Sequence, residues 1–209
     1  MKNIKPQRAP GRPKQTEQSI PLQEHILRTA ANLFMENGYE PISLQQIAKV
    51  CEVTKASIYY YFTSKAELFT AAVVFMLQIA RRSTLRILEE KDDFRLRLER
   101  VAKAKMMKSH VDMETMLREA RPHLTDEQYG RIRQAEMDIH ISLAEYFQMA
   151  MNQGQIRQGN AIFLAHAFSS LVMLGNSENA LEQITTQEEL ARAVVDLFWV
   201  GIAEQSRHT

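Results

Sequence analysis

Cysteine is almost absent from the 209-residue sequence, which contains only Cys51. One cysteine excludes a disulfide framework and a cysteine-based zinc site. No apolar run approaches the ~20 residues that a membrane-spanning helix needs. The basic N-terminal segment also lacks the apolar stretch of a secretory signal. We therefore expect a cytoplasmic protein with no membrane partner.

The sequence also lacks the patterns of strands and of catalysis. No segment of any length alternates apolar and polar residues in the way a half-buried strand does. There is no nucleophile–base pair, phosphate-binding loop or metal triad; Glu136 and His140 share a helix face, but a third metal ligand is missing. These absences predict an all-α protein that is not an enzyme and holds no metal or cofactor. A deep pocket with two close titratable groups of shifted pKa would favour an enzyme instead.

Charge is unevenly distributed along the chain. Residues 1–65 contain nine Lys and Arg against five Asp and Glu, whereas residues 66–209 contain 17 against 20. Three prolines and few apolar residues predict that residues 1–19 form a disordered basic arm. A basic front end on a mildly acidic body suggests a polyanionic partner at one end of the protein, although a solubilising tail has the same composition.

Helical periodicity begins after this arm. Ile26, Ala30, Leu33 and Phe34 recur with the spacing of one helix face. Gly38 follows directly and is suited to a left-handed C-terminal cap.

Further helices are marked by their start signals. Thr54 can cap a helix, and capping-box sequences predict helix starts at Ser43-x-x-Gln46, Ser64-x-x-Glu67, Thr125-x-x-Gln128 and Thr186-x-x-Glu189. We expect about nine helices, three of them in a helix-turn-helix bundle. The remaining helices are expected near 65–90, 94–109, 112–120, 125–153, 161–181 and 187–204.

The segment Thr54–Phe62, "TKASIYYYF", predicts a helix with an unusual outer face. Ile58 and Phe62 lie one turn apart and, with Val53, form the inward stripe. The other faces carry Lys55, Ala56, Ser57, Tyr59, Tyr60 and Tyr61. A small residue, hydroxyls, a cation and phenols suit the major groove of DNA. An aromatic helix packed on a second domain is the alternative.

Several motifs in residues 26–69 belong together. They comprise Ala30, Leu33, Phe34, Gly38, Tyr39, Ile47, Ala48, Val53, Tyr59, Phe62 and Lys65. With these residues the segment closely resembles the DNA-binding domain of TetR-type bacterial transcriptional regulators. The resemblance implies a homodimer that binds a palindromic, double-stranded DNA operator. Outside this segment the chain resembles the family only in length and helical character.

The resemblance also implies individual DNA contacts. The residues that face the groove are Lys55, Ala56, Ser57, Tyr59 and Tyr60, and Thr54 opens the same helix. Tyr61 and Lys65 face phosphates. Gln45 reaches a base, and Ser43 and Gln46 lie near the DNA backbone. Lys65 stands in the first turn of a helix, where the helix N-terminus also favours a phosphate. For Gln45 and Gln46 a solvated surface is the alternative.

The turn between the second and third helices departs from the family pattern. The family has a small residue followed by glycine where this sequence has Cys51 and Glu52. A positive φ at Glu52 costs on the order of 1 kcal/mol, so we expect a different turn geometry with an ordinary negative φ. Cys51 is expected to be a buried, inert thiol, and the alternative is a redox switch.

The arm contains a second DNA-binding signal. Arg12 stands between Gly11 and Pro13 in a segment that resembles the Gly-Arg-Pro core of AT-hook sequences. Such a segment fits a narrow minor groove. Arg8, Arg12 and Lys14 are therefore candidate DNA contacts, and a non-specific electrostatic tail is the alternative.

The second half of the chain is rich in methionine, which adapts to varied apolar ligands and is also common in cores. We expect an apolar ligand pocket lined by Phe75, Met76, Met106, His110, Met113, Met116, Leu117, His140, Phe147, Met151 and Phe168. Arg118, Tyr146 and His166 are further candidates for its polar walls.

The last two predicted helices are apolar on nearly every side, and a helix of that kind must be buried on every side. In this family these helices form the dimer, as a four-helix bundle across a two-fold axis. The expected interface residues are Phe163, Ala167, Ser170, Leu171, Leu174, Val194, Val195, Phe198, Trp199 and Ile202.

Together these features predict a DNA-binding domain at residues 20–66 and a ligand-binding and dimerisation domain at residues 67–209. We expect a ligand-responsive repressor that an apolar small molecule releases from its operator. The alternative is a DNA-binding regulator that responds to a protein partner or to no ligand at all.

Overall fold

The computed structural model describes residues 21–106, 113–174 and 186–203, and every regular element in these ranges is a helix. The helices are α1 (Leu22–Asn37), α2 (Leu44–Val50), α3 (Lys55–Tyr61), α4 (Lys65–Leu88), α5 (Phe94–Met106), α6 (Met113–Ala120), the 3₁₀ turn η1 (Arg121–His123), α7 (Asp126–Asn152), α8 (Ala161–Leu174) and α9 (Gln187–Ile202). The expected all-α fold is confirmed. The arm, His110 and the predicted continuations of two helices into 107–109 and 175–181 lie outside the described residues.

The predicted start signals operate at most helix ends. Reciprocal capping boxes open α2, α7 and α9, and the Thr54 hydroxyl accepts from the Ser57 N–H at the start of α3. The box predicted at the start of α4 is only half formed. Ser64 Oγ accepts from the Glu67 N–H, but the Glu67 carboxylate turns away to another helix.

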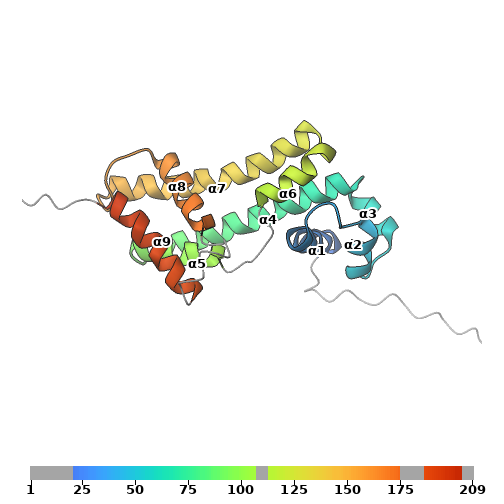
Figure 1. The fold of residues 1–209 in the computed structure, drawn as a ribbon, viewed down its shortest axis with the longest axis horizontal. Helices are drawn as coiled ribbons and strands as arrows, with labels where there is room; N and C mark the ends of the chain where they lie inside the picture. Colours follow the sequence, from blue (N-terminus) through green and yellow to red (C-terminus); the bar gives the residue numbers. More distant parts are fainter. Residues whose placement is uncertain (1–20, 107–112, 175–185, 204–209) are drawn as a thin grey trace, which may run out of the picture.

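α4 and α7 form the long axis of the molecule. They lie side by side, both running from the α1–α3 bundle toward the far end, where α5, α8 and α9 gather (Figure 1). Midway along the pair, Arg81 Nε donates to Ser142 Oγ at 2.7 Å. The α1–α3 bundle is thus attached to one end of the α4–α7 pair.

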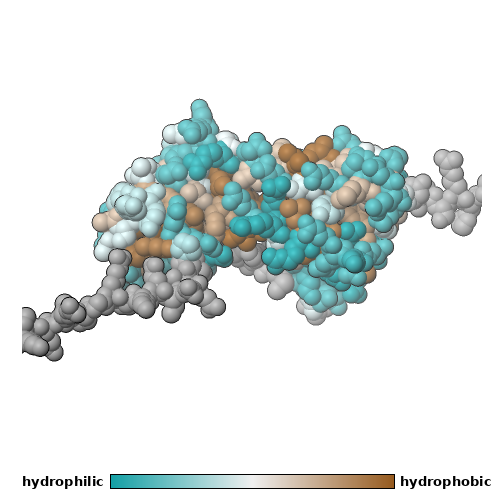
Figure 2. Space-filling view, turned by 180° about the vertical axis from the view of Figure 1, so that it is seen from behind, coloured by the Kyte–Doolittle hydropathy of each residue, from teal (hydrophilic) through white to brown (hydrophobic). Residues whose placement is uncertain are grey.

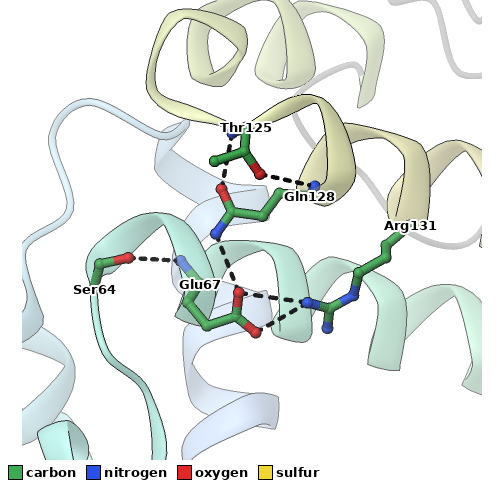
Figure 3. Close-up of polar contacts among 5 residues, drawn as sticks. All are labelled: Ser64, Glu67, Thr125, Gln128 and Arg131. Carbon is green, nitrogen blue, oxygen red and sulfur yellow. Dashed lines mark hydrogen bonds and ion pairs between the residues drawn. The ribbon is translucent and has the colours of Figure 1, made fainter.

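The diverted Glu67 carboxylate joins the two helix starts (Figure 3). Gln128, while capping α7 with Thr125, donates from Nε2 to Glu67 Oε2 at 3.1 Å. Arg131 Nη1 donates to Glu67 Oε1 at 3.1 Å. We call Glu67, Gln128 and Arg131 the helix-start clamp. It fixes the beginning of α4, three residues after α3 ends, to the beginning of α7.

An apolar core runs from the bundle into the body without interruption. The ring of Phe69 packs edge to face on the rings of Phe34 and Tyr39, with centroids 5.0 and 4.9 Å apart. The same core contains Met116 of α6 and Ile132 of α7. A second core fills the far end around Phe94, Phe147, Phe168 and Phe198. The boundary expected at residue 66 therefore falls inside a continuous packing unit.

By length and composition alone α4 passes a test for a membrane span, which the sequence analysis did not anticipate. Core helices of soluble proteins pass the same test. In this fold α4 packs against α1, α5 and α7 and carries Arg81, Arg82 and Arg86, which fits a core helix.

A double-mutant cycle tests the helix-start clamp. Glu67→Ala and Arg131→Ala should show a coupling in the free energy of unfolding of about 0.5–1 kcal/mol, since the pair is half exposed. Urea denaturation of the four proteins measures it. Arg133, equally exposed on the same helix, pairs with Glu114 and Glu136 instead, so Glu67→Ala with Arg133→Ala should show no coupling.

Candidate nucleic-acid interface

α3 has one buried side and one open side, as its sequence predicts. Ile58 is fully buried and Phe62 nearly so, which fixes the helix to the bundle. Tyr60 is 82% exposed, Tyr59 and Tyr61 are also exposed, and the rings of Tyr60 and Tyr61 meet edge to face. α3, which carries these side chains, lies at the end of the molecule opposite α9 (Figure 1).

The other residues predicted to contact DNA share this surface. Thr54, Lys55 and Ala56 are exposed and Ser57 is half-buried. Lys55 Nζ lies 5.6 Å from the centroid of the Tyr59 ring. One cation, short side chains and phenol hydroxyls are therefore accessible on α3, where they can donate hydrogen bonds to phosphates and base edges.

α2 uses two of its predicted contacts for its own cap. Gln46 Oε1 accepts from the Ser43 N–H at 2.7 Å, and Ser43 Oγ accepts from the Gln46 N–H at 3.2 Å. These bonds fix both side chains at the helix start. Gln45 is exposed beside them and is not part of the box. It is the better placed of the two glutamines to reach a base.

Lys65 has a structural role that sequence reasoning missed. Its Nζ donates to the Glu40 carbonyl at 3.2 Å and stands 4.1 Å from the centroid of the Tyr39 ring. Burial lowers the pKa of Lys65, which Glu40 partly offsets. The amine thus ties the start of α4 to the α1–α2 loop. Its contact with a phosphate stays a prediction.

The expectation for Glu52 is wrong. Its φ is +55°, so the turn keeps the left-handed geometry without glycine. The reason lies in the backbone: Val53 N–H donates to Ala48 O at 2.9 Å and Glu52 N–H to Lys49 O at 3.2 Å. This pair of bonds is a Schellman motif, which requires a left-handed residue at this position.

Other sequence expectations in this region have mixed outcomes. Gly38 has φ +82° and ψ −179°, a positive-φ extended conformation rather than the left-handed helical one.

Cys51 is buried, and burial raises the pKa of its thiol, consistent with an inert residue. The arm residues Arg8, Arg12 and Lys14 lie outside the described part of the chain, so their DNA contacts stay predictions.

The residues predicted for one ligand pocket are divided between the two cores. Met76, Met113, Met116 and Leu117 belong to the first core or pack against it, whereas Met106, Phe147, Met151 and Phe168 belong to the second. Phe75 lies under Arg28 of α1, with the guanidinium carbon 5.5 Å from its ring centroid. Their lining of one pocket stays a prediction. His140 lies in α7 between Ile139 of the first core and Leu143 of the second.

Two surface hollows occur elsewhere on the body. A shallow hollow of about 600 Å³ lies between α7 and α8 and is lined mainly by Ile141, Ala144 and Ile162 with their neighbours. A smaller one of about 260 Å³ includes Arg97, Tyr146 and Met149. None of the predicted pocket residues lines either hollow, although Tyr146 was a candidate for a polar wall.

The residues predicted for the dimer interface fall into a buried group and a group that reaches the surface. Val195, Phe198 and Ile202 are buried in the second core of the same chain, so their assignment to the surface of a dimer is wrong. The sequence pattern could not separate an apolar helix buried by its own chain from one buried by a partner. Phe163 and Ser170 are exposed, whereas Ala167, Leu171, Val194 and Trp199 are half-buried. The side chain of Leu174 lies outside the described set.

Exposed apolar residues that the sequence analysis missed complete this surface. Leu197 and Val200 of α9 are 69% and 79% exposed, and Met173 of α8 is also exposed. With Phe163 they define the α8–α9 apolar face. Apolar surface is visible along the upper edge of the C-terminal half in Figure 2. The i, i+3 spacing of Leu197 and Val200 was the available signal.

The open tyrosine face on the last helix of a three-helix bundle, joined to a larger helical body, defines a helix-turn-helix DNA-binding protein. Comparison with known sequences agrees. Residues 26–72 match the family described as bacterial regulatory proteins, tetR family. Residues 26–72 therefore form a DNA-binding domain of this family of transcriptional regulators.

Two curated relatives are similar to part of this chain. The uncharacterized HTH-type transcriptional regulator YuxN of Bacillus subtilis (strain 168) is 30% identical over 122 residues, which cover 56% of this chain and 42% of YuxN. The biofilm operon icaADBC negative regulator IcaR of Staphylococcus aureus (strain Newman) is 38% identical over 52 residues, 25% of this chain and 28% of IcaR. The chain thus spans less than half the length of each relative.

Solved structures share the fold over nearly the whole chain. The reduced form of E. coli NemR has a TM-score of 0.71 at 18% identity and covers 89% of this chain and 100% of NemR. AibR in complex with isovaleryl coenzyme A and operator DNA has a TM-score of 0.64 at 24% identity, covering 85% and 97%. A regulator from Saccharomonospora viridis in complex with choline has a TM-score of 0.69 at 21% identity, covering 88% and 98%.

The positive φ of Glu52 has a measurable consequence. Glu52→Gly should raise the free energy of unfolding by about 1 kcal/mol, because glycine adopts this conformation without a Cβ clash. Urea denaturation checks it. In the matched control, Glu36→Gly at an exposed position of α1, stability should fall by about the same amount. Equal losses in both variants would contradict strain at Glu52.

Proposed function

We propose that the protein is a homodimeric repressor that binds a palindromic operator through α3 and is released by a small molecule. The observation that carries the proposal is the open face of α3, where Lys55, Ala56, Tyr59 and Tyr60 are exposed on a helix anchored by buried Ile58. A solvated helix face more often carries Glu, Lys and Gln. The relative IcaR, a negative transcriptional regulator, is similar to part of this chain, which supports repression.

Dimerisation is supported by the α8–α9 apolar face. Phe163, Met173, Leu197 and Val200 leave large apolar side chains in water in the isolated chain, and covering them with a second copy stabilises both chains. Two copies of α8 and α9 would form a four-helix bundle. A two-fold dimer of this kind presents its α3 helices about 34–36 Å apart, one turn of DNA.

Ligand control has mixed support. Relatives of the same fold are described in complex with isovaleryl coenzyme A or choline. The predicted pocket residues of this chain, however, are packed in two cores. That packing favours the second candidate, a DNA-binding regulator that responds to a partner protein or to no ligand. In either case α4 transmits the response to α3, because it begins beside α3 and ends in the second core.

The proposal is tested by fluorescence anisotropy of the protein on the DNA upstream of its own gene, with a random duplex of equal length as control. Salt is titrated first, and small molecules are added afterwards. Tight, site-selective binding that one compound releases supports a ligand-controlled repressor. Selective binding that no compound releases favours the second candidate. Equal affinity for both duplexes contradicts operator recognition by this head.

Tyr60 provides the sharpest test of the recognition helix. Tyr60→Ala should weaken operator binding about tenfold or more, since it removes a contact worth about 1–3 kcal/mol, while the dimer persists. Leu96→Ala, which shortens an exposed side chain on α5, serves as the control and should leave affinity unchanged. Unchanged affinity of Tyr60→Ala would remove this residue from the interface.

The α8–α9 apolar face is tested by charge. The double variant Leu197→Arg/Val200→Arg should sediment as a folded monomer, because guanidinium groups cannot be buried unpaired in an apolar interface. Both side chains are exposed in the single chain, so folding should survive, whereas half-buried Trp199 packs near Phe94 and its loss would confuse unfolding with dissociation. Gln134→Arg, on exposed α7 surface, is the control. A persistent dimer in the double variant would place the interface elsewhere.

A further inference from the structure

A hollow of about 260 Å³ lies where the last residues of α4 meet α5 and the C-terminal end of α7. Buried Leu88 and Ala150 and exposed Met149 form its apolar part. The other lining residues are polar: Glu89, Arg97, Tyr146, Gln153 and Gln155. Pockets for drug-sized ligands measure roughly 300–1,000 Å³, so this hollow suits a smaller molecule. We call it the α4–α5–α7 hollow.

Arg97 brings a cation to the hollow that the protein does not neutralise. No ion pair joins it to a carboxylate of the described residues, whereas Arg95 and Arg100 of the same helix each form two. Its Nη1 donates to the Leu88 carbonyl, and its Cζ lies 5.3 Å from the centroid of the Phe94 ring. These contacts hold the guanidinium in place. Its Nε is buried with no partner among the described residues, so the group keeps unused donors.

Glu89 brings the opposite charge to the same hollow. Its side chain is exposed, and within the described ranges no ion pair joins it to Arg97 or to any other cation. The next residue, Glu90, is paired with Arg100 instead. Because the two charges of the hollow cancel, an ion of either sign meets one attractive and one repulsive group. A small molecule that carries both charges can satisfy both.

The remaining polar groups of the hollow are neutral. Burial raises the pKa of Tyr146, Glu89 adds to the rise and Arg97 opposes it, so the phenol keeps its proton at pH 7. Gln153 and Gln155 contribute carboxamides from a fixed main chain, since their N–H groups donate to carbonyls in the last turn of α7. A hydroxyl and two amides can donate and accept hydrogen bonds beside the charged pair.

We propose that the α4–α5–α7 hollow binds a free α-amino acid with an apolar side chain. Its carboxylate would lie on Arg97, its ammonium group on Glu89 and its side chain against Leu88, Met149 and Ala150. Both charged ends then form charge-assisted hydrogen bonds, which are stronger than neutral ones. The inference rests on the proposed function and deepens it, because it assigns a chemical class to the small molecule and places that molecule at the end of α4.

The test begins with leucine, valine and methionine, each titrated by calorimetry into the full chain up to millimolar concentration. At least one should bind. The tightest is then compared with its deaminated acid and its decarboxylated amine, which for leucine are isocaproate and isoamylamine. Each analogue should bind about tenfold more weakly, because it loses one charge-assisted hydrogen-bonded end. No binding of any of the three amino acids, or equal binding of either analogue, overturns the site.

Two substitutions assign the charged ends separately. Glu89→Gln should remove the preference for the amino acid over its deaminated acid and keep the preference over the amine. Arg97→Gln should do the reverse. Glu89 is exposed, so Glu89→Gln also covers the case in which Arg97→Gln fails to fold. A full preference over the deaminated acid in Glu89→Gln, or over the amine in folded Arg97→Gln, overturns the assignment.

Matched controls come from the neighbouring ion pair. Glu90→Gln removes an equal charge from the next residue, and Arg100→Gln removes one from the same helix as Arg97. Neither residue lines the hollow. Both variants should keep both preferences. Loss of either preference in a control would show that general surface charge, rather than the hollow, selects the ligand.

Operator anisotropy distinguishes this inference from the proposed function. Amino-acid binding that leaves operator affinity unchanged supports the hollow and removes its ligand from the proposed function. Release of the operator by the amino acid equally in the wild type and in Glu89→Gln leaves a ligand-controlled regulator and overturns the hollow as its controlling site. Failure of the free protein to select an operator contradicts the proposed function, while calorimetry still decides the hollow.

Discussion

The parallel pairing of α4 with α7 is the constraint on which the rest of the structure depends. Two hydrogen bonds fix its register, and both join residues 61 positions apart: Gln128 with Glu67, and Ser142 with Arg81. The first lies at the head end and the second near the middle. Since only three residues separate α3 from α4, a movement of the start of α4 carries α3 with it. The body thereby sets the position of the DNA-binding surface.

The same pairing explains how a signal in the body could reach the head. The first core, which includes the α1–α3 bundle (the head), extends along α4 and α7 to Leu77 and Ile139. The second core begins at Leu88 and Leu143. The polar contact of Arg81 with Ser142 lies at this junction. A ligand that binds one arrangement of the two cores more tightly than another would shift the head with them.

Local sequence signals predicted the elements of this fold well, because their causes are local. The capping residues Ser43, Thr125 and Thr186 act within one helical turn, and the burial of Ile58 follows from helix periodicity. The failures concern residues whose roles depend on distant segments. Glu67 was expected to close its own cap but reaches α7 instead.

The sequence also does not show which apolar residues are buried by their own chain. Phe198 and Leu197 are adjacent apolar residues of one helix, and only the tertiary structure shows that one is buried by its own chain while the other is exposed. The positive φ of Glu52 follows from the Schellman motif that ends α2, and glutamate adopts this φ at a cost in free energy.

The central claim is that the body holds the two heads of the dimer at a fixed spacing suited to successive turns of DNA. Pulsed electron resonance between spin labels at Glu36→Cys in both protomers tests it directly, because this position is exposed on α1 in the head and Cys51 is buried. We expect one narrow distance distribution on operator DNA, consistent with α3 helices about 34–36 Å apart. A broad distribution in the DNA complex, or no coupling between protomers, would contradict the claim.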